Sequence, residues 1–227
     1  MSTTDPHIGT LNEGSLHAAL KAEFARPGDR FEQRLDGFVI DIVRPGPTGD
    51  SLIEIQTGAF RAMGRKLDRL LGEYPIHLVH PIATGTWIVR EGQRDRKSPK
   101  RGSVYGLFDE LVSLPTVLDH PHLTLEIVLS EQEAVRVPDP KARRGRGGWR
   151  TVDRRLRRIV ERRVFERSTD LVALLPEDLP PVWTTADLAD GASIPRRQAQ
   201  AMAYCLRANE LVADLGRHRD GVHYRIC

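Results

Sequence analysis

The sequence predicts an α/β fold in which a mixed sheet is flanked by helices, followed by a small winged-helix domain. Apolar residues recur every three to four positions in residues 11–25 and 60–71, as in amphipathic helices. Between and after them lie short runs rich in β-branched residues, which is typical of strands. With 227 residues, of which 40% are hydrophobic and 29% charged, the chain can form one large core and one small one.

The N-terminal elements follow from this spacing. Leu16, Leu20 and Phe24 recur at four-residue intervals, so we expect a helix over residues 11–25 that ends before Pro27 and Gly28. The next helix covers residues 60–71 and stops near Gly72. Strands are expected at 30–35, 38–43, 51–57, 76–80, 86–90 and 123–129, a loop at 91–102 and a short helix at 104–112.

A basic segment separates the two predicted domains. The run KARRGRGG at residues 141–148 indicates a flexible hinge. After it, apolar residues on one helical face predict an arginine-covered helix; they are Val152, Leu156, Ile159, Val160 and Val164. The expected organisation is therefore a first domain at 11–138, a basic linker and arginine-rich helix at 139–167, and a winged-helix domain at 168–227.

The C-terminal domain is predicted from three helices and a hairpin. Residues 168–175 form the first helix, and Thr184 or Thr185 can cap the second. A third helix at residues 195–209 starts with proline in its first turn. Asp220-Gly221 between two short alternating runs predicts a hairpin. Three helices and a terminal hairpin indicate a winged helix.

Positive charge is concentrated although the net charge is only +3. Arginine dominates residues 141–167, and such clusters bind the phosphate backbone of nucleic acids. A solvated helix face, an acidic protein partner or a protein-docking role for the winged helix are the alternatives. The candidate nucleic-acid-binding residues are Arg154, Arg155, Arg157, Arg158, Arg196, Arg197, Gln198, Gln200, Arg217 and Arg219.

Two acidic residues stand within apolar strands. Asp41 lies in FVIDIV and Glu54 in SLIEIQT, and a turn-rich RPGPTGD joins the two runs. A hairpin would bring both carboxylates together, where burial is costly unless a cation or hydrogen bonds satisfy them. Carboxylate oxygens are suitable ligands for a divalent cation. The alternative is a pair of structural acids, each satisfied separately by a residue such as Lys66 or Arg61.

The order of Glu13 in a helix, Asp41 on a strand, and Glu54-Ile55-Gln56 on the next strand resembles the PD-(D/E)XK nuclease superfamily. The resemblance covers about residues 11–90. It implies an αβββαβ order with a mixed sheet, and Mg²⁺- or Mn²⁺-dependent cleavage of nucleic acid, which in this superfamily is more often DNA than RNA. It implies that Asp41 and Glu54 hold the metal, with Glu13 as a further carboxylate that Glu32 could replace.

Gln56 departs from the superfamily pattern, which most often has a lysine at this position. Glutamine can hold a water but supplies no positive charge. The resemblance implies that Lys66, on the following helix, could supply the missing amine; the alternative is an ordinary surface lysine. His17, His77 and His80 are weaker candidates, because an isolated histidine is usually structural or exposed.

Other function classes lack their signals. The sequence has no glycine-rich phosphate loop, no nucleophile elbow and no CxxC pair, and its two cysteines suggest no disulfide framework. An apolar leader or membrane-spanning run is also missing, so we expect a cytoplasmic protein without membrane contact. A homodimer is plausible. The expectation is a metal-dependent nuclease, or alternatively a non-catalytic DNA-binding regulator on a degenerate nuclease-like scaffold.

Overall fold

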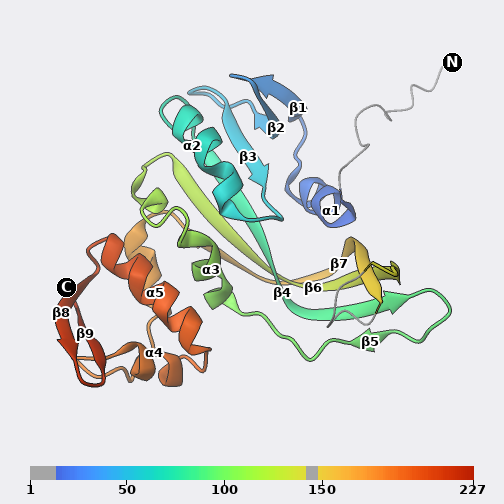
Figure 1. Ribbon diagram of the computed structural model, residues 1–227. Coiled ribbons are helices and arrows are strands. Elements are labelled where there is room, and N and C mark those ends of the chain that lie inside the picture. Colours follow the sequence, from blue (N-terminus) through green and yellow to red (C-terminus); the bar gives the residue numbers. More distant parts are fainter. Residues whose placement is uncertain (1–13, 142–147) are drawn as a thin grey trace, which may run out of the picture.

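The computed structural model describes residues 14–141 and 148–227 and shows a mixed α/β fold (Figure 1). Its helices and strands in chain order are α1 (Ser15–Phe24), β1 (Arg30–Leu35), β2 (Phe38–Arg44), β3 (Ser51–Ile55), the 3-10 turn η1 (Phe60–Met63), α2 (Gly64–Leu70), β4 (Ile76–Arg90), β5 (Arg96–Lys97), η2 (Val104–Gly106), α3 (Leu107–Leu111), η3 (Val117–Asp119), β6 (Leu123–Pro138), β7 (Trp149–Phe165), η4 (Ser168–Leu174), α4 (Thr185–Gly191), α5 (Arg196–Ala208), β8 (Val212–His218) and β9 (Gly221–Ile226). None of the helices in these two ranges combines the length and apolar character needed to cross a membrane.

The main sheet is mixed, as expected. Its strands lie in the order β1-β2-β3-β4-β6-β7, with the short β5 paired to β4. The first three strands form an antiparallel meander, β3, β4 and β6 run parallel to one another, and β7 returns antiparallel to β6. Helix α2 lies between β3 and β4 in the chain, because two parallel neighbours cannot be joined by a tight turn.

Helices cover both faces of this sheet. On one face, α1 buries Leu16, Leu20 and Phe24 against a cluster that includes Ile53 and Val79. On the other face, α2 and α3 pack over Leu52 and Leu78. Sheet and helices thus bury apolar surface in two layers, which is the main stabilising term of such a fold.

The prediction of an arginine-rich helix within residues 139–167 is wrong, because residues 149–165 form the long strand β7. Three bulges interrupt the alternation of this strand. The register with β6 leaves Val152, Arg157 and Val160 unpaired. Each extra residue moves the next inward position from two to three residues along the chain. Leu156 and Ile159, on either side of the extra Arg157, are thus half-buried and three residues apart, as in a helix, whereas Val152, Val160 and Val164 are exposed. Part of the predicted hinge, residues 142–147, lies outside the described ranges.

Smaller differences concern strand ends. The strands predicted at 76–80 and 86–90 are one strand, β4, with an irregularity between Ala83 and Gly85. Strand β3 ends at Ile55, so Gln56 lies just beyond it. The first helix begins at Ser15, and residues 11–13 of the prediction fall outside the described part of the chain.

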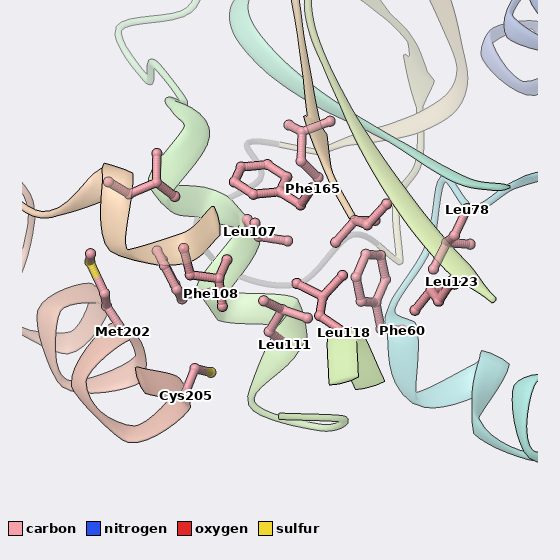
Figure 2. Packing of buried hydrophobic residues seen from close by; sticks show 14 of the residues in the cluster. Phe60, Leu78, Leu107, Phe108, Leu111, Leu118, Leu123, Phe165, Met202 and Cys205 are labelled. Carbon is pink, nitrogen blue, oxygen red and sulfur yellow. The ribbon is translucent and has the colours of Figure 1, made fainter. Parts of the chain in front are cut away.

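Residues 168–227, which we call the C-terminal unit, contain η4, α4, α5 and the hairpin β8–β9. Thr184 caps α4: its hydroxyl accepts from the Ala186 and Asp187 N–H groups, and the Asp187 carboxylate accepts from the Thr184 N–H at 2.7 Å. The unit packs on the sheet through α3. Figure 2 shows Phe108 and Leu111 of α3 between the sheet-side residues and Met202 of α5.

Candidate active site

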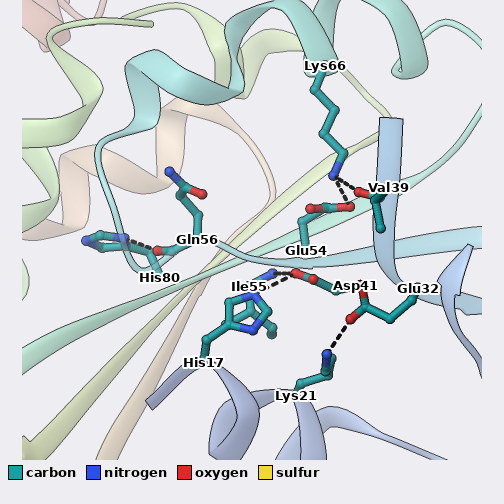
Figure 3. Close-up of polar contacts among 10 residues, drawn as sticks. All are labelled: His17, Lys21, Glu32, Val39, Asp41, Glu54, Ile55, Gln56, Lys66 and His80. Carbon is teal, nitrogen blue, oxygen red and sulfur yellow. Dashed lines mark hydrogen bonds and ion pairs between the residues drawn. The ribbon is translucent and has the colours of Figure 1, made fainter. Parts of the chain in front are cut away.

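Asp41 and Glu54 lie on the neighbouring strands β2 and β3, where the two strands separate (Figure 3). The ladder between them pairs Ile42 with Ile53 and ends there, so Asp41 and Glu54 occupy the next opposed positions. In place of a ladder bond, the Ile55 N–H donates to Asp41 Oδ2 at 2.8 Å. The Asp41 carboxylate thus fills the gap that opens between the strands.

Helix α1 supplies a second contact to Asp41. His17 Nε2 lies 3.1 Å from Asp41 Oδ2. Burial alone would raise the pKa of Asp41, but the hydrogen bonds from His17 and from the Ile55 N–H outweigh burial, so its pKa lies below the usual value. The structure therefore favours an ionised Asp41 at neutral pH.

Glu54 is buried, with only 6% of its surface exposed. Its Oε1 lies 2.5 Å from Lys66 Nζ, which reaches down from α2 and also donates to the Val39 carbonyl at 2.6 Å. Burial raises the pKa of Glu54 to about 7; the nearby Asp41 charge adds to this, whereas Lys66 opposes it. Glu54 therefore changes charge near neutral pH, and its charge is coupled to that of Asp41.

Gln56 is not part of this contact network. Its side-chain amide donates to the Ala59 carbonyl at 2.8 Å, and its own carbonyl accepts from His80 Nδ1 at 2.7 Å. The side chain lies apart from Glu54 and Asp41 in Figure 3. Among the sequence-derived candidates, the structure brings together Asp41, Glu54 and Lys66, and leaves Gln56 beside them.

The two candidates for an outer carboxylate are placed differently. Glu13 lies outside the described residues. Glu32 is on the exposed strand β1, has a φ of 50°, and forms an ion pair with Lys21 of α1. Glu32 therefore does not join the pair formed by Asp41 and Glu54, and the position of Glu13 is not described.

These donors can be tested against a divalent cation. Within residues 14–141 and 148–227, no group of three or more His, Cys, Asp or Glu side chains is arranged to hold a metal. Two carboxylates suffice for Mg²⁺, which keeps several of its waters. Glu54 Oε1 is buried without an aligned hydrogen bond, which fits an oxygen that binds a cation in addition to its ion pair. The ion pair with Lys66 equally fits the structural alternative stated above.

A cavity of about 340 Å³ lies beside α1, with Leu16 and His17 in its wall. His17 separates it from Asp41, and Thr57, Thr151 and Arg154 contribute to its wall. The sequence offers His17 only as a weaker candidate, because the packing of α1 on the sheet is what brings it to Asp41. Its position one turn before Leu20, at the edge of the apolar face, was the available signal.

Most β7 arginines form ion pairs. Arg155 pairs with Asp153, Arg157 with Glu133 and Arg158 with Glu131, at N–O distances of 3.3, 3.6 and 2.8 Å. Arg154 is exposed and lines the cavity beside His17. Much of the positive charge that the sequence concentrates here is therefore balanced by carboxylates of the same sheet.

The candidates in the C-terminal unit divide into two groups. Arg197 and Gln198 contact Asp109 of α3, at 2.8 and 3.0 Å. The others line a second cavity, between α5 and the hairpin β8–β9; they are Arg196, Gln200, Arg217 and Arg219.

Comparisons with known proteins give a family but no activity. The profile of the family described as "Domain of unknown function (DUF8091)" matches residues 14–166. The chain is also 34% identical over 187 residues to an "Uncharacterized protein" of Treponema pallidum (strain Nichols), covering 80% of this chain and 73% of the relative. No solved structure matches. The chain belongs to the DUF8091 family.

Proposed function

We propose that this member of the DUF8091 family is a Mg²⁺- or Mn²⁺-dependent nuclease that cleaves DNA, with Asp41 and Glu54 as the metal ligands. The observation that carries the proposal is a buried glutamate beside an ionised aspartate at the point where β2 leaves β3. A natural protein tolerates such a costly pair mainly where it has a function.

The order of elements supports the same proposal. Helix α1, the meander β1–β2–β3, helix α2 and the strand β4 parallel to β3 follow the αβββαβ order of the PD-(D/E)XK superfamily. The C-terminal unit has the order of a winged helix, and its basic side chains suit nucleic acid as substrate.

In the proposed reaction, the bound metal ion would lower the pKa of a water and offset negative charge on the scissile phosphate. Lys66 supplies the fixed amine that Gln56 lacks, and it is held by Glu54 and the Val39 carbonyl. His17 and the Ile55 N–H orient Asp41. The resemblance assigns Glu13 a supporting carboxylate role.

The test is cleavage of plasmid, linear duplex, single-stranded DNA and RNA by the full chain with Mg²⁺ or Mn²⁺. We expect Asp41→Asn and Lys66→Met to lower the rate by about 100-fold or more, because each removes charge at the reacting phosphate. Gln56→Ala should cost less than about tenfold. Exposed Lys100→Met is the matched control and should cleave at the wild-type rate. Equal cleavage by wild type and Asp41→Asn would overturn the proposal.

A non-catalytic DNA-binding scaffold is the second candidate, and one observation favours it. Lys66 already balances Glu54, and Gln56 is bonded to Ala59, so the site is satisfied without a metal ion. This candidate predicts that chelators do not change the affinity for DNA and that Mn²⁺ does not change the melting temperature. The nuclease proposal instead predicts that Mn²⁺ raises the melting temperature of wild type more than that of Asp41→Asn.

A further inference from the structure

The C-terminal unit contains a basic cavity of about 390 Å³. Its wall includes Thr185 of α4, Arg196 and Gln200 of α5, and Arg217, His218 and Arg219 of the hairpin. Arg196 and Gln200 are four residues apart on α5, so their side chains lie on one face of the helix. Two separate elements thus direct basic side chains towards one cavity.

The hairpin fixes the position of its two arginines. The pair His218 and Gly221 closes β8–β9, which leaves Arg219 and Asp220 as a two-residue loop. Gly221 has a φ of 145°, a conformation that residues with a Cβ rarely adopt. On the other side of the cavity, Arg196 Nε donates to Thr185 Oγ1 at 3.1 Å, which orients its guanidinium.

The positive charge around this cavity is not balanced as it is on β7. Across the described ranges, Arg196, Arg217 and Arg219 form no ion pair with a carboxylate, whereas Arg155, Arg157 and Arg158 each do. The wall of the cavity contains one acid, Asp220. Asp220 is bonded to His223 Nε2, at 2.9 and 3.1 Å from its two oxygens.

The first turn of α5 is used in a different way. A recognition helix would read base edges with the residues of this turn. Here, Arg197 and Gln198 both contact Asp109 of α3, which holds α5 against the sheet domain. Arg197 and Gln198 are therefore each paired with Asp109, although Arg197 stays exposed, whereas the arginines around the cavity have no carboxylate partner in the described ranges.

The geometry points to a binding site for backbone phosphates of nucleic acid in this cavity, independent of base sequence. A guanidinium presents paired donors that match phosphate oxygens, and three such groups converge here. This inference deepens the proposed function and rests on it for nucleic acid as the substrate. It assigns substrate holding to the C-terminal unit and not to the β7 arginines.

Binding is measured with the full chain in the presence of chelator, using fluorescence anisotropy of labelled 20-base-pair duplexes over a range of salt concentrations. The triple variant Arg196→Gln, Arg217→Gln, Arg219→Gln should bind at least tenfold more weakly. Its slope of log affinity against log salt should be smaller in magnitude by about 2 to 3, since each lost phosphate contact removes about 0.9. Two unrelated duplexes should bind wild type within about threefold of each other.

Two control variants test whether the loss of DNA affinity is specific to the cavity. Arg225→Gln removes an exposed arginine of the same hairpin that does not line the cavity, and Arg158→Gln removes one that is paired on β7. Both should retain wild-type affinity and slope. Circular dichroism melting curves check that the triple variant folds, and the three single variants, each expected to reduce the slope by about 1, replace it if it does not.

The inference is overturned if the salt slope is unchanged in the arginine variants, or if one duplex binds more than tenfold better than the other. Competition by polyglutamate as effective as that by DNA would also overturn it, in favour of an acidic protein partner. Asp41→Asn should lose cleavage and keep this binding. The binding measurement can therefore be interpreted even if the chain cleaves no nucleic acid. Loss of binding in the triple variant with cleavage intact would support the phosphate site and overturn its assignment to substrate holding.

Discussion

Glu54 gives the protein a stability that depends on pH. Its pKa is about 7 in the folded state against 4.5 as the reference, mainly because it is buried. The folded state therefore holds a proton that the unfolded state releases, and stability falls as pH rises from about 4.5 to about 7. The full difference corresponds to about 3 kcal/mol.

We predict that Glu54→Gln is more stable than wild type by about 1 to 3 kcal/mol at pH 8, and nearly equal to it at pH 4. Urea unfolding at several pH values measures this. Glu73→Gln, which changes an exposed carboxylate, is the control and should give no such trend. A variant that is less stable than wild type at pH 8 would show that the ion pair with Lys66 more than compensates for burial.

Neighbouring positions of Asp41 and Glu54 could be predicted from sequence, because two apolar strands joined by a turn pair as antiparallel neighbours. The contacts that set their charges could not. His17 and Lys66 reach the carboxylates from α1 and α2, which pack on opposite faces of the sheet. Their approach depends on how the two helices pack on the sheet, and local sequence patterns carry little information about that packing.

Helix α4 depends on its first residue more than its length suggests. It has only seven residues, so it cannot be stable through its own hydrogen bonds. Thr184 satisfies two N–H groups at its start, and Asp187 returns a bond to Thr184. The cap also adjoins Trp183, whose N–H and carbonyl pair with Tyr224 of β9.

Thr184→Ala should therefore lower the free energy of unfolding by about 1 kcal/mol, with a range of 0.5 to 2. Thr184→Ser keeps the hydroxyl and should retain most of the stability that Thr184→Ala loses. Urea unfolding followed by circular dichroism makes the comparison. Equal losses for alanine and serine would show that the methyl group, and not the cap, stabilises this turn.

Strand β7 marks a limit of prediction from sequence. Helices α2, α4 and α5 and strands β1, β2, β8 and β9 follow from apolar spacing and turn residues. In β7, bulges at Val152, Arg157 and Val160 interrupt the two-residue period. Its arginines pair with acids on neighbouring elements, such as Glu133. Both features depend on β6, which sequence patterns within β7 do not reveal.

The C-terminal unit and the sheet share one apolar core. Phe108 and Leu111 of α3 are fully buried between them, together with Met202 and Cys205 of α5. Polar contacts add to this interface, since Asn209 donates to the Pro115 carbonyl at 2.7 Å. A shared, buried core favours unfolding of both parts together, although the sequence suggests separate domains.

The thiol of Cys205 can report on this coupling. It is 0% exposed, and burial raises its pKa to about 12, so it should react only after α5 separates from α3. In a Cys227→Ser background, which removes the exposed thiol, alkylation of Cys205 should begin at the urea concentration at which the sheet melts by circular dichroism. Phe108→Ala should lower both midpoints together, by about 3 to 5 kcal/mol of unfolding free energy, because it opens a cavity in the shared core. Alkylation well below the melting midpoint of the sheet would show instead that the C-terminal unit opens independently, and that its phosphate-binding side chains can move relative to the carboxylates.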